Sequence, residues 1–291
     1  MKNRYTAFAF FVAVVTAIFG ATVYELLTFS LGNGLQSHMI FVPALSAYLI
    51  HAEREKVFAQ TSTGTLWGPL IVGVGLLLHL VALFVIANAA VRFHISLFGA
   101  LLALSGGFLA FFGPSATKAA LFPLCFLIFS FPLPDWLITQ IMAFLQDWSA
   151  SASQWGFRAL DVPVVRSGYV FEFPTFDVVV APECSGIRSG LVLFILSMVG
   201  GQLFLRRRWS RGAFILLSIP VTILKNSFRI VAISLLSVYV DPAFMDSYLH
   251  RSGGIFFFAL ALLCLVPVWW ILQRLEPRDT PEADPASHGA S

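Results

Sequence analysis

One cysteine of the sequence is placed where its thiol could act as a nucleophile. Cys184 lies in the segment APECSGIRSG, after a Val- and Phe-rich stretch that predicts strands and at the start of an apolar stretch that predicts a helix. A thiol at a helix N-terminus feels the positive end of the helix dipole and unpaired amides, which favour the thiolate. Arg188, one helical turn further on, is expected to share this face and to favour the anion further. The alternative is a boundary cysteine beside a glycine that only allows close helix packing.

A second unusual segment, ILKNSFRIVAISLL, carries Lys225, Asn226 and Arg229 inside an apolar stretch. Ionisable groups inside a span are costly, so they usually face a partner or a water-filled cavity. Asn226 and Arg229 are three residues apart and therefore share a helix face, with Thr222 one turn before Asn226. The eighteen residues from Arg211 to Arg229, at about 1.5 Å each, cover about 27 Å, which puts Arg229 near the far boundary of the membrane. The alternative is an arginine that snorkels to the outer headgroups.

The third candidate is His250, in the segment DPAFMDSYLHRSGG before the last apolar stretch. A histidine exchanges protons near neutral pH, which suits a general acid or base that works with a thiol. Gly253 and Gly254 would let another backbone or a substrate approach closely. A loop histidine is often incidental, however, and the neighbouring Arg251 could take an electrostatic role instead.

These three segments contain the groups that amide cleavage by a thiol requires. The reaction needs an activated sulfur, a positive group or donor for the developing oxyanion, and an acid that protonates the leaving amine. Cys184, Arg229 and His250 fit these roles in that order.

The rest of the sequence predicts no cofactor, no metal site and no nucleic-acid partner. It contains no Walker loop, dinucleotide fingerprint or nucleic-acid-binding module. The other histidines are scattered without metal-binding spacing; they are His38, His51, His79, His94 and His288. Cys125 and Cys264 lie inside apolar stretches and are expected to be small core residues, so no disulfide framework is implied.

The elements that must position these groups are helices in a membrane. Hydrophobic residues make up 58% of the chain, charged residues make up 11%, and the mean hydropathy is +0.84, which excludes a water-soluble domain. We expect an all-α polytopic membrane protein with about eight transmembrane helices, because about 20 apolar residues cross a bilayer. The expected spans are 7–27, 36–51, 66–88, 93–113, 118–134, 184–205, 212–239 and 252–273. The second is short and the fifth contains Pro123.

The basic clusters predict the orientation. If eight spans alternate, Lys2, Arg4, the basic residues of 51–56, Lys118, those of 206–211, Arg274 and Arg278 all fall on one side. Both termini are then cytoplasmic, and Cys184, Arg229 and His250 lie toward the exterior. We expect residues 1–275 to form a single integral membrane domain and the polar tail 276–291 to be disordered.

The segment 135–183 is expected to lie outside the membrane, before the sixth helix. Its first part spaces Trp136, Ile141, Phe144, Leu145 and Trp148 like one face of a helix, which predicts an amphipathic helix in the membrane interface. Its second part is rich in Val, Phe and Tyr, with turn residues at 167–168 and 174–175. It predicts a β-hairpin of two or three short strands that ends at 182.

Taken together, the motifs ECSGIRSG, NSFRI and H-x-x-GG resemble the exosortase and archaeosortase family of membrane transpeptidases over about 160–260. The resemblance implies that Cys184 is the nucleophile, Arg229 the stabilising cation and His250 the proton-transfer residue. It also implies an enzyme of the cytoplasmic (inner) membrane that acts on exported proteins with a C-terminal sorting signal, such as the PEP-CTERM class. Such a signal consists of a short motif, one span and a basic tail. The acceptor is left open, with lipid- or polysaccharide-linked groups as candidates.

Two other functions compete with this interpretation. The intramembrane Lys225 and Arg229 would also suit a membrane transporter or an exopolysaccharide-export component without thiol chemistry, although no internal repeat supports an inverted-repeat transporter. A non-catalytic scaffold in contact with membrane lipids is the third possibility.

Overall fold

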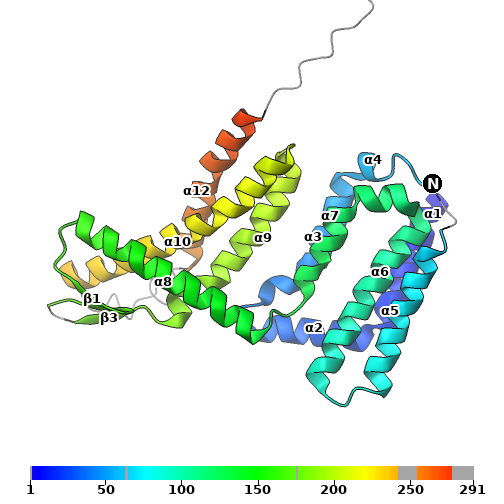
Figure 1. Ribbon diagram of the computed structural model, residues 1–291, viewed down its shortest axis with the longest axis horizontal. Helices are drawn as coiled ribbons and strands as arrows, with labels where there is room; N and C mark the ends of the chain where they lie inside the picture. The colour runs from blue at the N-terminus through cyan, green and yellow to red at the C-terminus, as the bar shows by residue number, and fades with distance from the viewer. Residues whose placement is uncertain (1, 63–64, 175, 242–253, 277–291) are drawn as a thin grey trace, which may run out of the picture. The chain divides into compact units, whose positions relative to one another are not determined.

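The structure is a computed structural model that describes residues 2–62, 65–174, 176–241 and 254–276 (Figure 1). Within them the chain is mostly α-helical, with one small sheet. The chain divides into two compact units, Met1–Gln140 and Ile141–Ser291. The predicted helical polytopic membrane fold is confirmed by the number of long apolar helices. The predicted tail lies outside the described residues, apart from Glu276, and a single membrane domain over 1–275 stays a prediction.

The described helices give five spans, or seven if bent helix pairs are counted. The five are α5 Trp67–Phe84, α6 Ala89–Ala119, α9 Ile187–Phe204, α10 Arg208–Tyr239 and α12 Gly254–Leu275. The two bent pairs are α1 Lys2–Ile18 with α2 Gly20–Gly32, and α7 Leu121–Phe126 extended by η2 Leu127–Ser130 with α8 Asp135–Ala159. The predicted second span corresponds to α3 Val42–Ala52, whose 11 residues are fewer than the roughly 20 that cross a bilayer. The total of eight stays a prediction.

The first unit also contains two short connections, η1 Ser37–Ile40 and α4 Arg54–Val57. Its helix α6 differs from the predicted span 93–113, because it continues through a kink to Ala119. The kink is at Gly113, which has φ +84° and precedes Pro114. A Cβ at Gly113 would lie 2.2 Å from the Ser62 hydroxyl oxygen, so both the backbone conformation and the close contact require glycine.

Helices α5 and α6 pack at backbone distance in the first unit (Figure 1). A Cβ on Gly75 would lie 2.5 Å from the Gly99 carbonyl oxygen and 2.9 Å from the Ala103 nitrogen. Small residues allow this approach, which supplies the van der Waals contact that holds helices together in lipid.

Helices α1 and α2 meet at a bend of 75°, and a buried histidine binds the backbone there. His79 of α5 hydrogen-bonds to the carbonyl of Ile18, where α1 ends. Its Nδ1 lies 2.6 Å from the Ser96 hydroxyl oxygen, which lies 2.5 Å from that of Thr22. Buried polar groups in an apolar surrounding need such partners, so the broken helix and the histidine stabilise each other.

Helix α8, most of which belongs to the second unit, is amphipathic as predicted. Its buried side is mostly small and polar, with Gln146, Ser149, Ala150 and Ser153, and also contains the apolar Leu145 and Phe157. Its exposed large side chains include Trp136, Phe144, Trp148 and Trp155. Leu145, which the sequence placed with the aromatic residues, is buried. The position of the helix in the membrane interface stays a prediction.

The predicted hairpin is a three-stranded antiparallel sheet, with β1 Val165–Ser167, β2 Val170–Glu172 and β3 Asp177–Val179 in that order. Phe171 in the middle strand pairs with Arg166 on one side and Val178 on the other. Phe171 and Val178 belong to a core that contains Phe157 of α8 and Ile230 and Val231 of α10. The sheet is therefore fixed on two helices of its own unit.

Helices α9, α10 and α12 pack against one another (Figure 1), and two polar side chains hold their ends together. Arg211 donates from Nε to the Leu205 carbonyl at 2.8 Å, which satisfies the C-terminal end of α9. Glu276, directly after α12, accepts from the amides of Arg206 and Arg207 at 2.9 Å each and from the Ser210 hydroxyl. The carboxylate thus ties the segment that leads into α10, and Ser210 in its first turn, to the end of α12.

These hydrogen bonds predict a pH-dependent contribution to stability. Burial would raise the pKa of the Glu276 carboxyl, but the hydrogen bonds from Arg207, Ser210 and Arg206 and the charge of Arg206 outweigh it and lower the pKa. A carboxyl with a lowered folded-state pKa stabilises the fold above its usual pKa, and the contribution is lost as the pH falls through the lowered value.

We therefore expect Glu276→Gln, which mimics the protonated acid, to lower stability at pH 7 by about 1 kcal/mol, as for loss of a helix cap. Thermal unfolding in micelles would show a midpoint about 2 °C lower. The difference from the parent protein should shrink as the pH falls below the usual pKa of a carboxyl and on through the lowered one. A difference that stays constant as the sample is acidified up to the point of acid unfolding would contradict this account.

Candidate functional site

The chain enters the candidate site through a turn that separates the sheet from α9. After β3, Ala181 is extended, and η3 Pro182–Ser185 forms one 3₁₀ turn. Gly186 follows with φ +78° and is the N-cap of α9, which begins at Ile187. The sequence-based start of this helix at 184 is therefore wrong. The left-handed conformation of Gly186 cannot continue a right-handed helix, so Cys184 precedes α9 instead of beginning it.

This correction changes the argument for Arg188. With a turn between them, Cys184 and Arg188 are not one α-helical turn apart on a common face. Arg188 is the second residue of α9 and is exposed. Its supporting role stays a prediction, and the side chains of Glu183 and Cys184 lie outside the part of the chain that the structure describes.

Gly186 lies directly against the polar middle of α10. A Cβ at this position would lie 3.0 Å from Oδ1 of Asn226 and 3.3 Å from Nζ of Lys225. The structure thus brings the ECSG segment and the KNSFR segment together, although about 40 residues separate them in the sequence. Asn226 is completely buried, and Arg229, one turn further on, is half-buried. Helix α10 is continuous from Arg208 to Tyr239, as assumed when the distance from Arg211 to Arg229 was derived from the helical rise per residue.

Lys225 takes part in this contact, and the sequence did not assign it to the site. Its Nζ donates to the Ser189 hydroxyl at 2.5 Å, and that hydroxyl donates to the Gly186 carbonyl at 3.0 Å. The amide of Gly190 donates to the same carbonyl at 2.8 Å. The sequence feature that could have indicated this role is a lysine inside an apolar stretch, next to Asn226. Its partner could not be read from that stretch.

Close packing beside the turn keeps α9 on α10. A Cβ at Gly190 would lie 2.9 Å from Cγ2 of Thr222 and 3.7 Å from Cδ1 of Leu145 of α8. Thr222 is buried one turn before Asn226, as the helical spacing predicted. Three helices therefore meet next to the first turn of α9.

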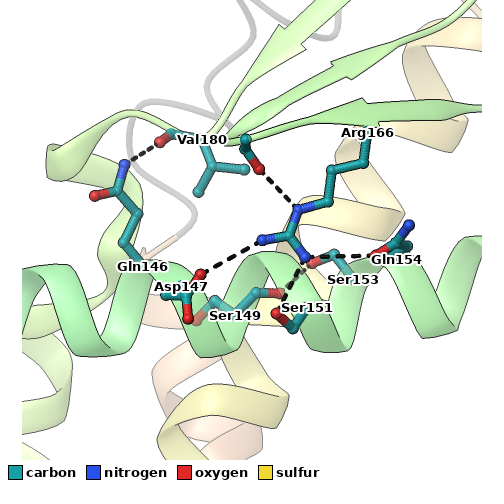
Figure 2. A network of polar contacts seen from close by, with 9 residues as sticks. Gln146, Asp147, Ser149, Ser151, Ser153, Gln154, Arg166 and Val180 are labelled. Carbon is teal, nitrogen blue, oxygen red and sulfur yellow. Dashed lines mark hydrogen bonds and ion pairs between the residues drawn. The ribbon is translucent and has the colours of Figure 1, made fainter.

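Polar side chains of α8 fix the sheet that leads into the turn (Figure 2). Gln146 donates to the Val180 carbonyl at 2.5 Å, directly after β3. Arg166 of β1 lies over α8, where it pairs with Asp147 at 3.5 Å and donates to Ser151 at 3.0 Å. It also donates to Gln154 on α8 and to the Gly168 carbonyl of its own hairpin.

A direct bond joins α8 to α10. The Ser153 hydroxyl donates to that of Ser227 at 3.2 Å, next to Asn226 in the sequence. Both serines are buried. The helix that carries the sheet is thereby held at the same part of α10 that contacts Gly186.

The third predicted motif lies next to the described residues. His250 and Gly253 are outside them, and Gly254 is the first residue of α12. Helix α12 packs on α9 and α10, the two helices that carry the other motifs.

Comparison with known families adds a match that is independent of these contacts. Residues 31–267 match the profile of the transmembrane exosortases, which is more than half of the 291 residues. The chain belongs to the transmembrane exosortase family. The matched range includes Cys184, Arg229 and His250, and it extends into the first unit, beyond the 160–260 over which the motifs showed the resemblance. Neither the comparison with curated proteins nor that with solved structures gave a match.

The geometry of the turn predicts that this exosortase requires glycine at position 186. Gly186→Ala would force a left-handed conformation on a residue with a Cβ, which costs about 1–2 kcal/mol, and would push that Cβ against Asn226. We expect a thermal midpoint in micelles lower by about 2–4 °C per kcal/mol lost.

Gly212→Ala is the matched control. Gly212 is in α10, and a Cβ there would meet nothing within 4 Å. Because alanine favours helix, this change should leave the midpoint unchanged or raise it slightly. An equal midpoint for Gly186→Ala and the parent protein would show that the turn is not as described.

Proposed function

We propose that this exosortase is a cysteine transpeptidase that cleaves C-terminal sorting signals of exported proteins at the outer face of the cytoplasmic membrane. The observation that carries the proposal is the contact of Gly186 with Lys225 and Asn226. It sets the turn that contains Cys184 beside a buried cation and a buried amide within a membrane-spanning helix. Membership of the exosortase family supports an enzyme of this type.

In the proposed first step, the Cys184 thiolate attacks the carbonyl carbon of the scissile peptide bond. A C–S bond forms, and the carbonyl oxygen becomes an oxyanion that Arg229 stabilises. The oxyanion then collapses and the C–N bond breaks. His250 gives its proton to the leaving amine, so the substrate remains on the enzyme as a thioester.

In the second step, an acceptor nucleophile attacks the thioester carbon. His250 takes the proton of the nucleophile, the C–S bond breaks, and the sulfur leaves as a thiolate. Both residues then return to their starting protonation states. Water in place of the acceptor would give hydrolysis by the same steps, and the proposed acceptor is a lipid- or polysaccharide-linked group.

The position of the cations gives this chemistry its physical basis. Lys225 is buried and Arg229 is half-buried in an apolar helix, where charges interact much more strongly than in water. Fixed donors in a region of low polarity stabilise a developing anion without the reorganisation that solvent would need.

The two ends of α9 differ in charge, which supports an orientation of the site in the membrane. Arg206, Arg207 and Arg211 gather where α9 ends and α10 begins, and Glu276 ties the end of α12 to the same place. Basic residues favour the cytoplasmic side, so we assign this end to the cytoplasm and the Gly186 end to the exterior. Membrane lipids then surround the apolar faces, and a substrate span would lie among them.

The central prediction concerns the thiol. Cys184→Ala should reduce processing of a co-expressed substrate with a motif, one span and a basic tail by roughly a thousandfold or more, because the nucleophile is lost. The measurement is the size shift of the substrate on a gel, with membrane insertion of the variant checked in parallel. Cys125→Ala and Cys264→Ala are matched controls that should retain processing. Intact processing by a well-inserted Cys184→Ala variant would reject the proposed function.

Transport or polysaccharide export without thiol chemistry is the second candidate, because Lys225 is buried within a span. Arg229→Gln separates the candidates. Under the proposed mechanism it lowers processing by about a hundredfold to a thousandfold, since an oxyanion donor is lost, and leaves polysaccharide export unchanged. Loss of export in Arg229→Gln, together with normal export in Cys184→Ala, would favour the second candidate. A scaffold would tolerate both changes.

A further inference from the structure

We propose that Lys225 is a positioning residue that raises the thiolate fraction of Cys184, through its positive charge and through its hydrogen bond to the first turn of α9. The inference rests on the proposed function, because it assigns Lys225 a role toward the nucleophile of that reaction. The mechanism proposed above uses Cys184, Arg229 and His250 and assigns no role to Lys225.

The first step of the argument is the burial of the ammonium group. Lys225 is 7% exposed in an apolar helix. Its hydrogen bond in the described part of the chain goes to the hydroxyl of Ser189, which carries no charge. The salt bridges found among the described residues join other groups, Lys56 with Glu53 and Arg166 with Asp147. A buried ammonium is costly unless a negative charge compensates it, so a lysine here calls for an anion nearby.

The second step is the place where the ammonium lies. Nζ is next to Gly186, the N-cap of α9, where the amides of the first helical turn carry partial positive charge. The Gly186 position has no side-chain cap. Arg229 of α10 adds a second positive charge that acts on Lys225. A cation at a helix N-terminus is unfavourable, so this arrangement of two cations and the helix end favours an anion at the turn.

The third step identifies the anion. The charged groups of the surrounding elements include Lys225 and Arg229 on α10, Arg188 on α9, and Asp147 on α8, which is exposed and paired with Arg166. The carboxylates of the sheet, Glu172 and Asp177, are also exposed. The turn itself, Pro182–Ser185, contains Glu183 and Cys184. Of these two, only the thiol gains nucleophilic reactivity when it becomes an anion. Glu183 is the competing recipient of the positive charge, and the experiment separates the two.

The hydrogen bonds add a mechanical contribution. Lys225 donates to Ser189, and Ser189 donates to the carbonyl of Gly186. This chain fixes the peptide group after the left-handed glycine, which orients the turn on α10. A neutral side chain that keeps this bond would preserve the turn and remove only the charge.

The test measures the reactivity of Cys184 directly, in the full-length protein in micelles. Cys125 and Cys264 are exposed free thiols, so both are first replaced by serine. The rate of alkylation by iodoacetamide between pH 5 and pH 10 then gives the midpoint of thiol ionisation. In Lys225→Met and Lys225→Gln we expect this midpoint to rise by about one unit or more, because a nearby positive charge is lost. The alkylation rate at pH 7 then falls about tenfold.

Three further variants make the result specific. Lys225→Arg keeps the charge and should leave the midpoint within a few tenths of the parent value. Lys56→Met removes an exposed lysine that pairs with Glu53 in the other unit and should change nothing. Glu183→Gln should lower the midpoint, since it removes the competing negative charge.

An unchanged midpoint in Lys225→Gln, which can keep the bond to Ser189, would overturn the inference even if Lys225→Met fails to fold. A Lys225 effect that disappears in the Glu183→Gln background would also overturn it, because the lysine would then serve Glu183. The assay needs no substrate, so its failure is distinct from that of the proposed function. If processing depends on Cys184 but the ionisation midpoint is unchanged in the Lys225 variants, the proposed function stands and only the inference about Lys225 fails.

Discussion

The site depends on one contact, in which the backbone of Gly186 lies against Lys225 and Asn226. A turn next to a membrane-spanning helix needs partners for its polar groups, because the apolar surroundings supply none. Here the Gly186 carbonyl accepts from the Ser189 hydroxyl and the Gly190 amide, and Lys225 of α10 donates to that hydroxyl. A Cβ at position 186 would lie only 3.0 Å from Oδ1 of Asn226, so the fit favours glycine. The residue must also adopt a left-handed conformation. Both the conformation and the tight fit thus favour glycine, and the backbone course of the turn that contains Cys184 follows from it.

The rest of the second unit holds that contact in place. The sheet ends directly before the turn, and Gln146 of α8 binds the carbonyl of Val180 at that end. Helix α8 is in turn joined to α10 through Ser153 and Ser227. The small polar face of α8 thus serves the site, and its aromatic residues remain exposed. This division explains why a helix with a polar buried face is stable next to a membrane.

The sequence predicted those features that depend on residue type and local spacing. A stretch rich in Val, Phe and Tyr predicted the strands, and helical spacing predicted α8. Polar residues at helical spacing within an apolar stretch predicted the shared face of Thr222 and Asn226. The start of α9 was missed because it depends on Gly186, whose backbone conformation is set by its contact with α10. Propensity along the segment favoured a helix from 184 onward, and a tertiary contact overrode it.

Other differences have the same origin. The first apolar stretch contains a break that His79, about 60 residues away, stabilises through the Ile18 carbonyl. Hydropathy alone reads such a stretch as one straight helix. Lys225 was recognised as unusual, but several functions fit an intramembrane lysine until its partner Ser189 is known. His250 was a candidate from the sequence alone; it lies outside the described residues, and its role stays a prediction, although the family match spans its position.

The two ends of α9 show how the fold separates stability from reactivity. At the end near the arginines, the polar backbone groups are satisfied by side chains, with Arg211 on the Leu205 carbonyl and Glu276 on the amides of Arg206 and Arg207, directly before α10. At the other end, Gly186 provides no side-chain cap, and a lysine lies where a helix normally favours an acidic group. A fold that served stability alone would place a carboxylate there. The arrangement instead leaves the positive potential of α9 and α10 available to an anion at the turn, which is what a thiolate nucleophile needs.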